Sequence, residues 1–175
     1  MAASSRLQHA GSRNARGSAL LLFLAIGCAS KSEPSREPLR PDPAGTRTVG
    51  AIEYRGELLV LESFPVQLAG SVTLTNRSDG ERTLAFPDGC VVLLRAYRAD
   101  ERVWDQVGGL GCTQAIVNVT LAAGESNTLR APTASAYEIL SPGHPAGTYR
   151  LTAYLRPAGA AEIEVDMGEA DLAVP

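Results

Sequence analysis

The stretch QLAGSVTLTNRSDGERTLAF, residues 67–86, decides the fold class of this chain. In its first half Val72 and Leu74 share one face of an extended chain, and Thr73 and Thr75 share the other, which is typical of a half-buried strand. The polar run after it is rich in Asn, Ser, Asp and Gly, residues that satisfy or relieve the backbone in a turn. RTLAF follows as a second short strand. The stretch therefore predicts two strands joined by a tight turn.

Short β-type runs separated by turn signals continue on both sides of this stretch. The further candidate strands are AIEYRGELLVLES, CVVLLRAY, RVWDQV, QAIVNVTLAAGES, NTLRAP, GTYRLTAYLRP, AEIEVDM and ADLAV. Only PTASAYEIL, residues 132–140, favours a short turn of helix. Seven or more such strands predict an all-β fold, an antiparallel β-sandwich, with a barrel as the alternative that periodicity does not separate from it. Trp104, the single tryptophan, is expected to enter the core.

Residues 1–27 have the pattern of a signal peptide. Three arginines and no acidic residue precede an apolar run, residues 19–26, which is too short to span a bilayer. The run ends in LAIGC, which resembles the lipobox of bacterial lipoproteins, and that resemblance implies a lipid on Cys28. The alternatives are an ordinary signal peptide cut nearby and a buried helix with an incidental cysteine. The lipoprotein interpretation predicts a protein of the cell envelope, anchored to a membrane and facing the periplasm or the exterior.

The next segment, residues 28–48, contains four prolines and is predicted to be a disordered linker. Prolines at this density lack backbone donors and favour extended, solvated chain. We therefore expect three parts: a signal peptide over residues 1–27, a lipidated linker over residues 28–48, and a β-sandwich domain over residues 49–175.

The remaining two cysteines, Cys90 and Cys112, are predicted to form a disulfide in an oxidising compartment. A zinc site needs about four ligands, and the mature chain adds only one histidine, His144. The C-x-x-C spacing of a redox pair is absent from the sequence. Two buried free thiols are the alternative to the disulfide.

No set of residues in the sequence predicts catalysis, a cofactor or a metal. His144 lies in the turn SPGHPAG and is expected to face solvent, and no G-x-S-x-G motif is present. Asp100, Glu101 and Asp105 are expected to form the solvated face of a hairpin. The formal net charge is −3. An acidic chain without a basic stripe is a poor candidate for binding nucleic acid, so that class is excluded.

The order of short motifs resembles the intracellular proteinase inhibitor (BsuPI-type) domain. The resemblance covers about residues 68–157 and begins with a strand ending in Asn and a polar turn. The residues that carry it are Asn76, Phe86, Val103, Trp104, Gly124, Glu125, Gly147, Thr148 and Tyr149. It implies an immunoglobulin-like β-sandwich and inhibition of a serine protease. Tyr149 is expected to hydrogen-bond back across a corner of the sandwich.

Two loops are candidates for binding a protein partner: VGGLGCTQ, residues 107–114, and LSPGHPAG, residues 140–147. In the first loop Gly108, Gly109 and Gly111 would let a partner approach the backbone, with Leu110 as an apolar anchor. The alternative is that Leu110 folds inward. We therefore expect a membrane-anchored, non-catalytic binding module, with proteinase inhibition as the role that the resemblance implies. An accessory envelope lipoprotein that joins an assembly by strand addition at a sheet edge is the alternative.

Overall fold

The computed structural model describes residues 45–63, 65–141 and 143–173. The predicted signal peptide, Cys28 and most of the predicted linker lie outside these residues. In the described part, no helix is both long and apolar enough to cross a membrane. The elements are β1 (Thr46–Val49), β2 (Ile52–Leu61), β3 (Gln67–Asn76), β4 (Arg82–Phe86), β5 (Leu93–Arg98), β6 (Glu101–Asp105), the 3-10 helix η1 (Gln106–Gly109), β7 (Val117–Leu121), β8 (Ser126–Arg130), β9 (Ala134–Ser135), α1 (Ala136–Leu140), β10 (Gly147–Leu155) and β11 (Ile163–Leu172).

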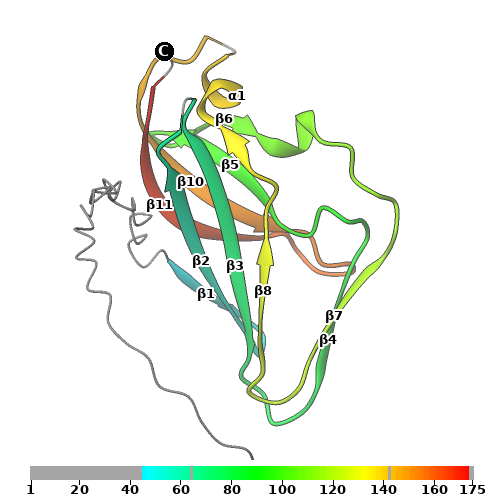
Figure 1. Cartoon of the computed structure of the whole chain (residues 1–175). Coiled ribbons are helices and arrows are strands. Elements are labelled where there is room, and N and C mark those ends of the chain that lie inside the picture. The colour runs from blue at the N-terminus through cyan, green and yellow to red at the C-terminus, as the bar shows by residue number, and fades with distance from the viewer. Residues whose placement is uncertain (1–44, 64, 142, 174–175) are drawn as a thin grey trace, which may run out of the picture. The chain divides into compact units, whose positions relative to one another are not determined.

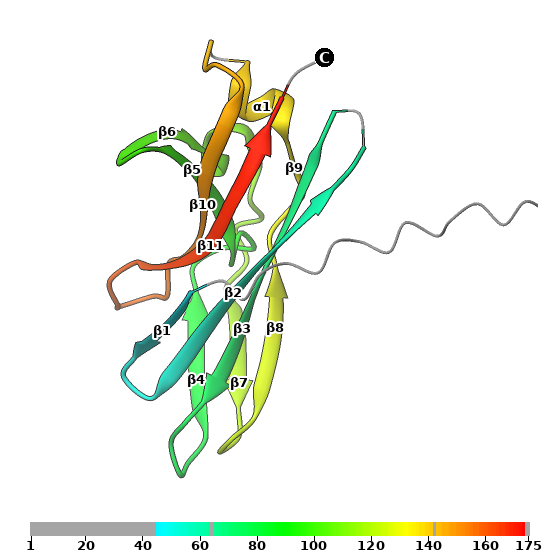
Figure 2. The same ribbon diagram turned by 90° about the vertical axis from the view of Figure 1, so that its left-hand side faces the viewer.

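The strands form antiparallel sheets that pack around one core, which confirms the predicted all-β sandwich (Figure 1). One sheet has the order β1-β2-β3-β8, with β9 also paired to β3, and a second has the order β11-β10-β5-β6. A two-stranded ribbon, β4–β7, completes the arrangement. Both views place this ribbon at the end of the domain opposite α1 and β6 (Figure 2).

The alternation expected in β3 holds for Val72, Thr73 and Leu74; Thr75, expected on the polar face, pairs there with the Ser126 hydroxyl at 2.8 Å but is buried. Val72 and Leu74 are fully buried, whereas Thr73 is only half-buried and its hydroxyl pairs with that of Thr128 on β8 at 2.9 Å. Period-two alternation places successive side chains on opposite faces of a strand, so one face joins the core and the other forms a polar ladder with the neighbouring strand. The sequence pattern therefore predicted both the strand and the face that it buries.

The two runs expected to close the chain, AEIEVDM and ADLAV, are parts of a single strand, β11. The register between β10 and β11 shifts between Arg150 and Thr152, opposite Gly168, whose φ is +88°. The Asp166 side chain accepts a hydrogen bond from the Gly168 N–H at 2.8 Å. A glycine in this conformation is typical of a β-bulge, which bends a strand without ending it. The glycine therefore marks a bulge and not a turn.

The start of the domain also differs from the expectation, since β1 begins at Thr46, inside the segment predicted as linker. Its four residues are exposed, so they carry no apolar alternation that a sequence pattern could reveal. Behind β1, strand β11 crosses close to β2: a Cβ added to Gly56 would lie 2.8 Å from the Asp166 carbonyl oxygen. Gly56 is therefore required by the close approach of the two strands.

Tyr149 ties the start of β10 to the preceding turn. Its side chain is fully buried, and its hydroxyl donates a hydrogen bond to the Pro145 carbonyl four residues upstream, at 2.5 Å. This geometry is that of a tyrosine corner and confirms the expectation for this residue.

At the opposite end Asn76, also fully buried, donates from its amide to the carbonyls of Gly80, Leu121 and Ala122 at 2.7–3.0 Å.

Candidate functional site

A hollow of about 360 Å³ opens at the end of the domain that carries β6, η1 and α1. Two segments that are distant in the sequence meet there: the end of β6 with η1, and residues 133–141, which include β9 and α1. The residues that line the hollow are Trp104, Asp105, Gln106, Gly108, Gly109, Leu110, Thr133, Glu138 and Ser141. The predicted binding loop thus forms one wall of the hollow.

Asp105 and Gln106 hold the start of this loop. Asp105 is the N-cap of η1, and its Oδ1 accepts a hydrogen bond from the Val107 N–H at 3.2 Å. The Gln106 side chain is buried: its Oε1 accepts from the Leu94 N–H at 3.0 Å, and its Nε2 donates to the Pro132 carbonyl at 2.7 Å. A buried amide with both ends bonded fixes the backbone that carries it. The backbone at the start of the loop is therefore held rigidly.

The far side of the loop is fixed by a disulfide between Cys90 and Cys112, as predicted, with a Cα–Cα distance of 5.4 Å. Beside it the Gly89 N–H donates to the Thr113 carbonyl at 2.9 Å. A Cβ on Gly89 would lie 2.2 Å from the Thr113 hydroxyl oxygen, so a larger residue there would require the Thr113 side chain to rotate away. The disulfide thus joins the loop to the segment that leads into β5.

Between these two fixed points the loop is open to solvent. Gly108, Gly109 and Gly111 are exposed, and a Cβ added at any of them would meet no atom within 4 Å. Leu110 is half-buried and lines the hollow, so neither of the two expectations for it, exposed anchor or core residue, describes it fully. Further along, Ile116 is 72% exposed, the largest exposure of any large hydrophobic side chain in the described residues.

The second candidate loop reaches the same end of the domain, because its Ser141 lines the hollow. Pro142 of this loop lies outside the described residues. The expectation that His144 faces solvent is wrong: its ring is half-buried, and Nε2 lies 3.1 Å from the Val103 carbonyl oxygen on the edge of β6. An edge strand has backbone groups that lack a strand partner, and His144 covers one of them. Both candidate loops therefore border one surface.

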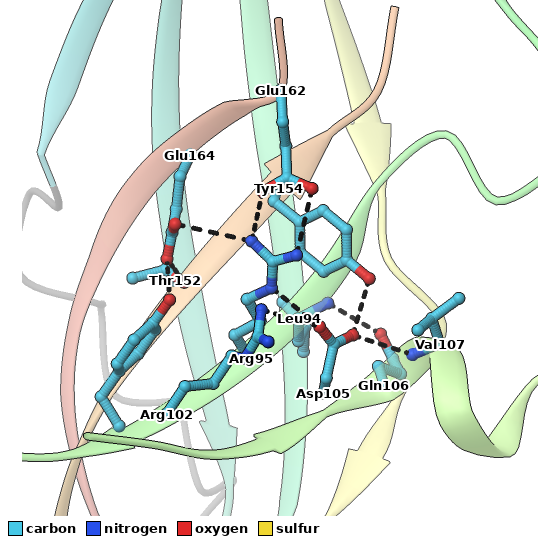
Figure 3. A network of polar contacts seen from close by, with 11 residues as sticks. Leu94, Arg95, Arg102, Asp105, Gln106, Val107, Thr152, Tyr154, Glu162 and Glu164 are labelled. Carbon is cyan, nitrogen blue, oxygen red and sulfur yellow. Dashed lines mark hydrogen bonds and ion pairs between the residues drawn. The ribbon is translucent and has the colours of Figure 1, made fainter.

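The outer face of the sheet β11-β10-β5-β6 carries a network centred on Arg95 (Figure 3). Arg95 is 7% exposed, and its Nε donates to Asp105 at 2.9 Å. Its other nitrogens bond both carboxylate oxygens of Glu162 and lie 3.5 Å from Glu164. The guanidinium also lies over the Tyr154 ring, 3.6 Å from its centroid. Each nitrogen of this cation therefore bonds a carboxylate, and an aromatic ring covers one face of its plane.

The same network extends to the tyrosines and threonine around it. The Tyr154 hydroxyl donates to Asp105 Oδ1, and the Tyr97 and Thr152 hydroxyls donate to Glu164 Oε1, each at 2.6 Å. Arg102 adds an ion pair to Asp105 at 3.5 Å. Asp105 thus joins two structures, because it binds the Arg95 network with its side chain and caps η1 with the same carboxylate.

The network changes the pKa values of its acids and phenols. Burial acts to raise the pKa of Asp105, but hydrogen bonds from Tyr154, Arg95 and the Val107 N–H outweigh it and lower that pKa below its usual range. Burial likewise acts against ionisation of Glu164, and the bonds from Thr152 and Tyr97 with the charge of Arg95 lower its pKa. Burial, followed by the bond to Asp105, raises the pKa of the Tyr154 phenol. The carboxylates are therefore held ionised.

Two expectations for the hairpin need correction. Asp105 was expected on a solvated face with Asp100 and Glu101; these two are exposed, but Asp105 is half-buried in the network. The reason is register, because β5 and β6 place Arg95 directly opposite Asp105. Trp104 was expected in the core, but it is half-buried, packs against the core at its edge and lines the hollow.

Sequence reasoning also missed Arg95 and Gln106. The only signal for Arg95 was a charged residue inside the apolar run CVVLLRAY, where alternation places it on the face opposite Leu94 and Ala96. Nothing in the sequence marks Gln106, because its two partners, Leu94 and Pro132, come from distant segments.

Asp88, Cys90 and Cys112 bring three potential metal-binding atoms together near the loop. The two sulfurs are joined in the disulfide, and a disulfide sulfur has no thiolate to offer a metal ion. Asp88 accepts a hydrogen bond from the Cys90 N–H at 2.9 Å and pairs with Arg156 at 3.2 Å. The disulfide and the contacts of Asp88 therefore fix the segment beside the loop and do not form a metal site.

The chain is similar to several solved structures. It is 18% identical to the ApaA protein from Bordetella pertussis, with a TM-score of 0.35, over 77% of this chain and 98% of that one. It is 14% identical to a β-glucosidase from Listeria innocua solved with glucose, with a TM-score of 0.34, over 72% of this chain and 17% of the enzyme. The same enzyme with gluconolactone gives 17% identity and a TM-score of 0.32.

The search of curated proteins gives no match. A family model described as intracellular proteinase inhibitor, BsuPI, matches residues 62–159, more than half of the 175 residues. The match begins just before β3, ends after β10, and includes the disulfide, the loop and all the residues that line the hollow. On this match, the chain belongs to the BsuPI family of intracellular proteinase inhibitors.

Proposed function

We propose that this protein is a non-catalytic binding module that inhibits a proteinase through the loop of residues 107–114. Membership of the BsuPI family is the observation that carries the proposal. The geometry of the loop supports it, because the segment is solvent-exposed yet fixed by Gln106 on one side and by Cys112 on the other.

A loop of this kind suits tight binding for an entropic reason. Ordering a flexible segment on association costs free energy, and a segment that is already fixed at both ends loses less. The three exposed glycines allow a partner to approach the backbone closely, since no Cβ intervenes. Leu110, half-buried at the edge of the hollow, presents an apolar group between them.

The proposal extends to the location of the protein. The lipobox-like LAIGC supports a lipid on Cys28, which would hold the domain at a membrane of the cell envelope, with a protein partner on the same side. Metabolic labelling with a palmitate analogue should mark the wild-type protein and leave Cys28→Ser unmarked. Equal labelling of the two proteins would contradict the lipid anchor.

An assembly role in the envelope is the second candidate, and one observation favours it. Strand β8 lies at the edge of its sheet and, within the described residues, pairs only with β3. The backbone groups on its outer edge therefore have no strand partner among the described residues and could pair with another strand. In this candidate the partner would bind along β8 and not at the loop of residues 107–114.

Inhibition assays separate the two candidates. The full protein, purified in detergent, should slow the hydrolysis of a peptide substrate by one or more bacterial serine proteases. It should not itself be cleaved during the assay. Leu110→Asp places a charge in the loop and should weaken inhibition about tenfold or more, because an apolar contact at an interface becomes a desolvated carboxylate.

Val49→Asp is the matched control, because Val49 is also partly exposed, at 39%, but lies on β1. It should leave inhibition unchanged, and both variants should melt within a few degrees of wild type. Inhibition that is equal in wild type and Leu110→Asp would remove the loop from the mechanism. Absence of inhibition across the panel would contradict the inhibitory role.

A further inference from the structure

The chemistry of the hollow indicates what it could bind. Its lining contains two carboxylates, those of Asp105 and Glu138, and no Lys, Arg or His. Trp104 adds a half-exposed indole to the same wall. From residue 45 onward the chain carries ten arginines against sixteen acidic residues, so the net charge of the domain is negative as well. A site with this charge favours a cation over an anion.

The two carboxylates differ in their remaining capacity to accept hydrogen bonds. Asp105 is already saturated, with Oδ1 bonded to Tyr154 and the Val107 N–H and Oδ2 bonded to Arg95. Glu138 uses Oε2 to accept the Ser135 N–H at 2.7 Å, as part of the capping box of α1. No hydrogen bond to its Oε1 occurs among the described residues, so this oxygen is available to a ligand.

We propose that the hollow binds the side chain of an arginine on the surface of a partner protein. The guanidinium would bond Glu138 Oε1 and stack on the indole of Trp104. A planar, weakly hydrated guanidinium suits both contacts better than an ammonium does, since it combines stacking with directed donors. A volume of about 360 Å³ lies at the small end of ligand sites, which fits one long side chain.

This inference rests on the proposed function, because the hollow shares Gly108, Gly109 and Leu110 with the loop of residues 107–114. A partner that binds this loop would bring its own surface over the hollow. Exposed Val107 and Tyr137 are next in sequence to lining residues, at 38% and 60% exposure, and provide apolar contacts around the cation. The arginine would therefore add specificity to an interface made by the loop.

The single tryptophan gives a direct measurement. Titration of the full protein with Nα-acetyl-arginine amide, at constant ionic strength, should give a saturable change in Trp104 fluorescence in the millimolar range. Nα-acetyl-lysine amide should bind more weakly, and Nα-acetyl-leucine amide should give no saturable change. Glu138→Gln keeps the acceptor for the Ser135 N–H but removes the charge, and should weaken arginine binding about two- to fivefold.

Glu125→Gln is the matched control. Glu125 also bonds a backbone N–H three residues away, that of Ala122 at 2.7 Å, but it lies in the turn between β7 and β8 at the opposite end of the domain (Figure 1). It should leave arginine binding unchanged. Ser141→Arg, at an exposed lining position, should abolish it by supplying a guanidinium within the chain.

The outcomes separate this inference from the function on which it rests. A wild-type protein that inhibits a protease but gives no arginine-specific saturation would overturn the arginine site alone. Equal arginine affinity in Glu138→Gln and Glu125→Gln would also overturn it. Arginine binding that depends on Glu138, in a protein that inhibits no protease, would support the site and contradict the inhibitory role.

Discussion

Charged and aromatic side chains gather in two regions: the outer face of the sheet β11-β10-β5-β6 and the loop end of the domain. The two regions differ in how far the polar groups are bonded within the chain. Around Arg95 each charge meets a partner within the chain, and the guanidinium is 7% exposed. At the hollow, Glu138 has one oxygen without a bond among the described residues, and the glycines of the loop are open to solvent. The two regions are joined at Asp105, which belongs to both.

The difference separates a structural cluster from a candidate binding surface. Groups that are fully bonded within the protein would lose those bonds to a ligand, so a saturated network rigidifies the fold and is a poor receptor. Groups with open bonding capacity beside a solvent-accessible hollow gain bonds when a ligand arrives. We therefore expect substitutions in the Arg95 network to act on stability and substitutions at the loop to act on binding.

The largest effect should follow from Arg95→Met. This change keeps much of the apolar stem but leaves Asp105 and Glu162 without their main partner. Breaking an ion pair whose cation is buried costs about 4 kcal/mol at most. Urea denaturation should show that loss in the free energy of unfolding. Arg77→Ala is the control, because Arg77 pairs with Glu53 at 2.7 Å on the surface, where solvent screens the charges, and its loss should change the free energy of unfolding far less. Similar losses in the two variants would show that the network is ordinary surface charge.

The next effect tests how the loop is held. Replacing Cys90 and Cys112 together by serine should lower the free energy of unfolding by about 3 kcal/mol, because the unfolded chain regains the entropy of a loop of 22 residues. Amide exchange should become faster across residues 107–114 and remain slow in β10, which the disulfide does not touch. Unchanged exchange in the loop would mean that Gln106 and Asp105 alone fix it.

The smallest effect is a pH dependence of the network. The pKa values of Asp105 and Glu164 are lowered in the folded protein, so their contribution to stability is complete above the unfolded values, about 3.9 for Asp and 4.3 for Glu. It is lost as the pH falls through the folded values, because the unfolded state then binds more protons. The urea midpoint should therefore fall below about pH 4, and less steeply in Arg95→Met. Parallel curves for the two proteins would contradict this role of Arg95.

Much of the fold could be predicted from local patterns. The alternation in residues 67–76 predicted β3 and its buried face, the candidate helix PTASAYEIL contains α1, and Tyr149 forms the expected corner. The two errors in the predicted strands, at β1 and at β11, also have local causes. β1 is exposed and shows no alternation, and the two closing runs are one strand because Gly168 makes a bulge where the sequence suggests a turn.

For the candidate site, the sequence by itself determined the cysteine pair, the glycines of the loop and the family resemblance, since these are properties of residue type and order. Only the tertiary structure decided that Asp105 is bonded to Arg95, that Gln106 bridges Leu94 and Pro132, and that both candidate loops border one hollow with Trp104 and Glu138. The physical reason is that a side chain's bonding partners depend on strand register and chain crossing. Neither is encoded in the local alternation of apolar and polar residues.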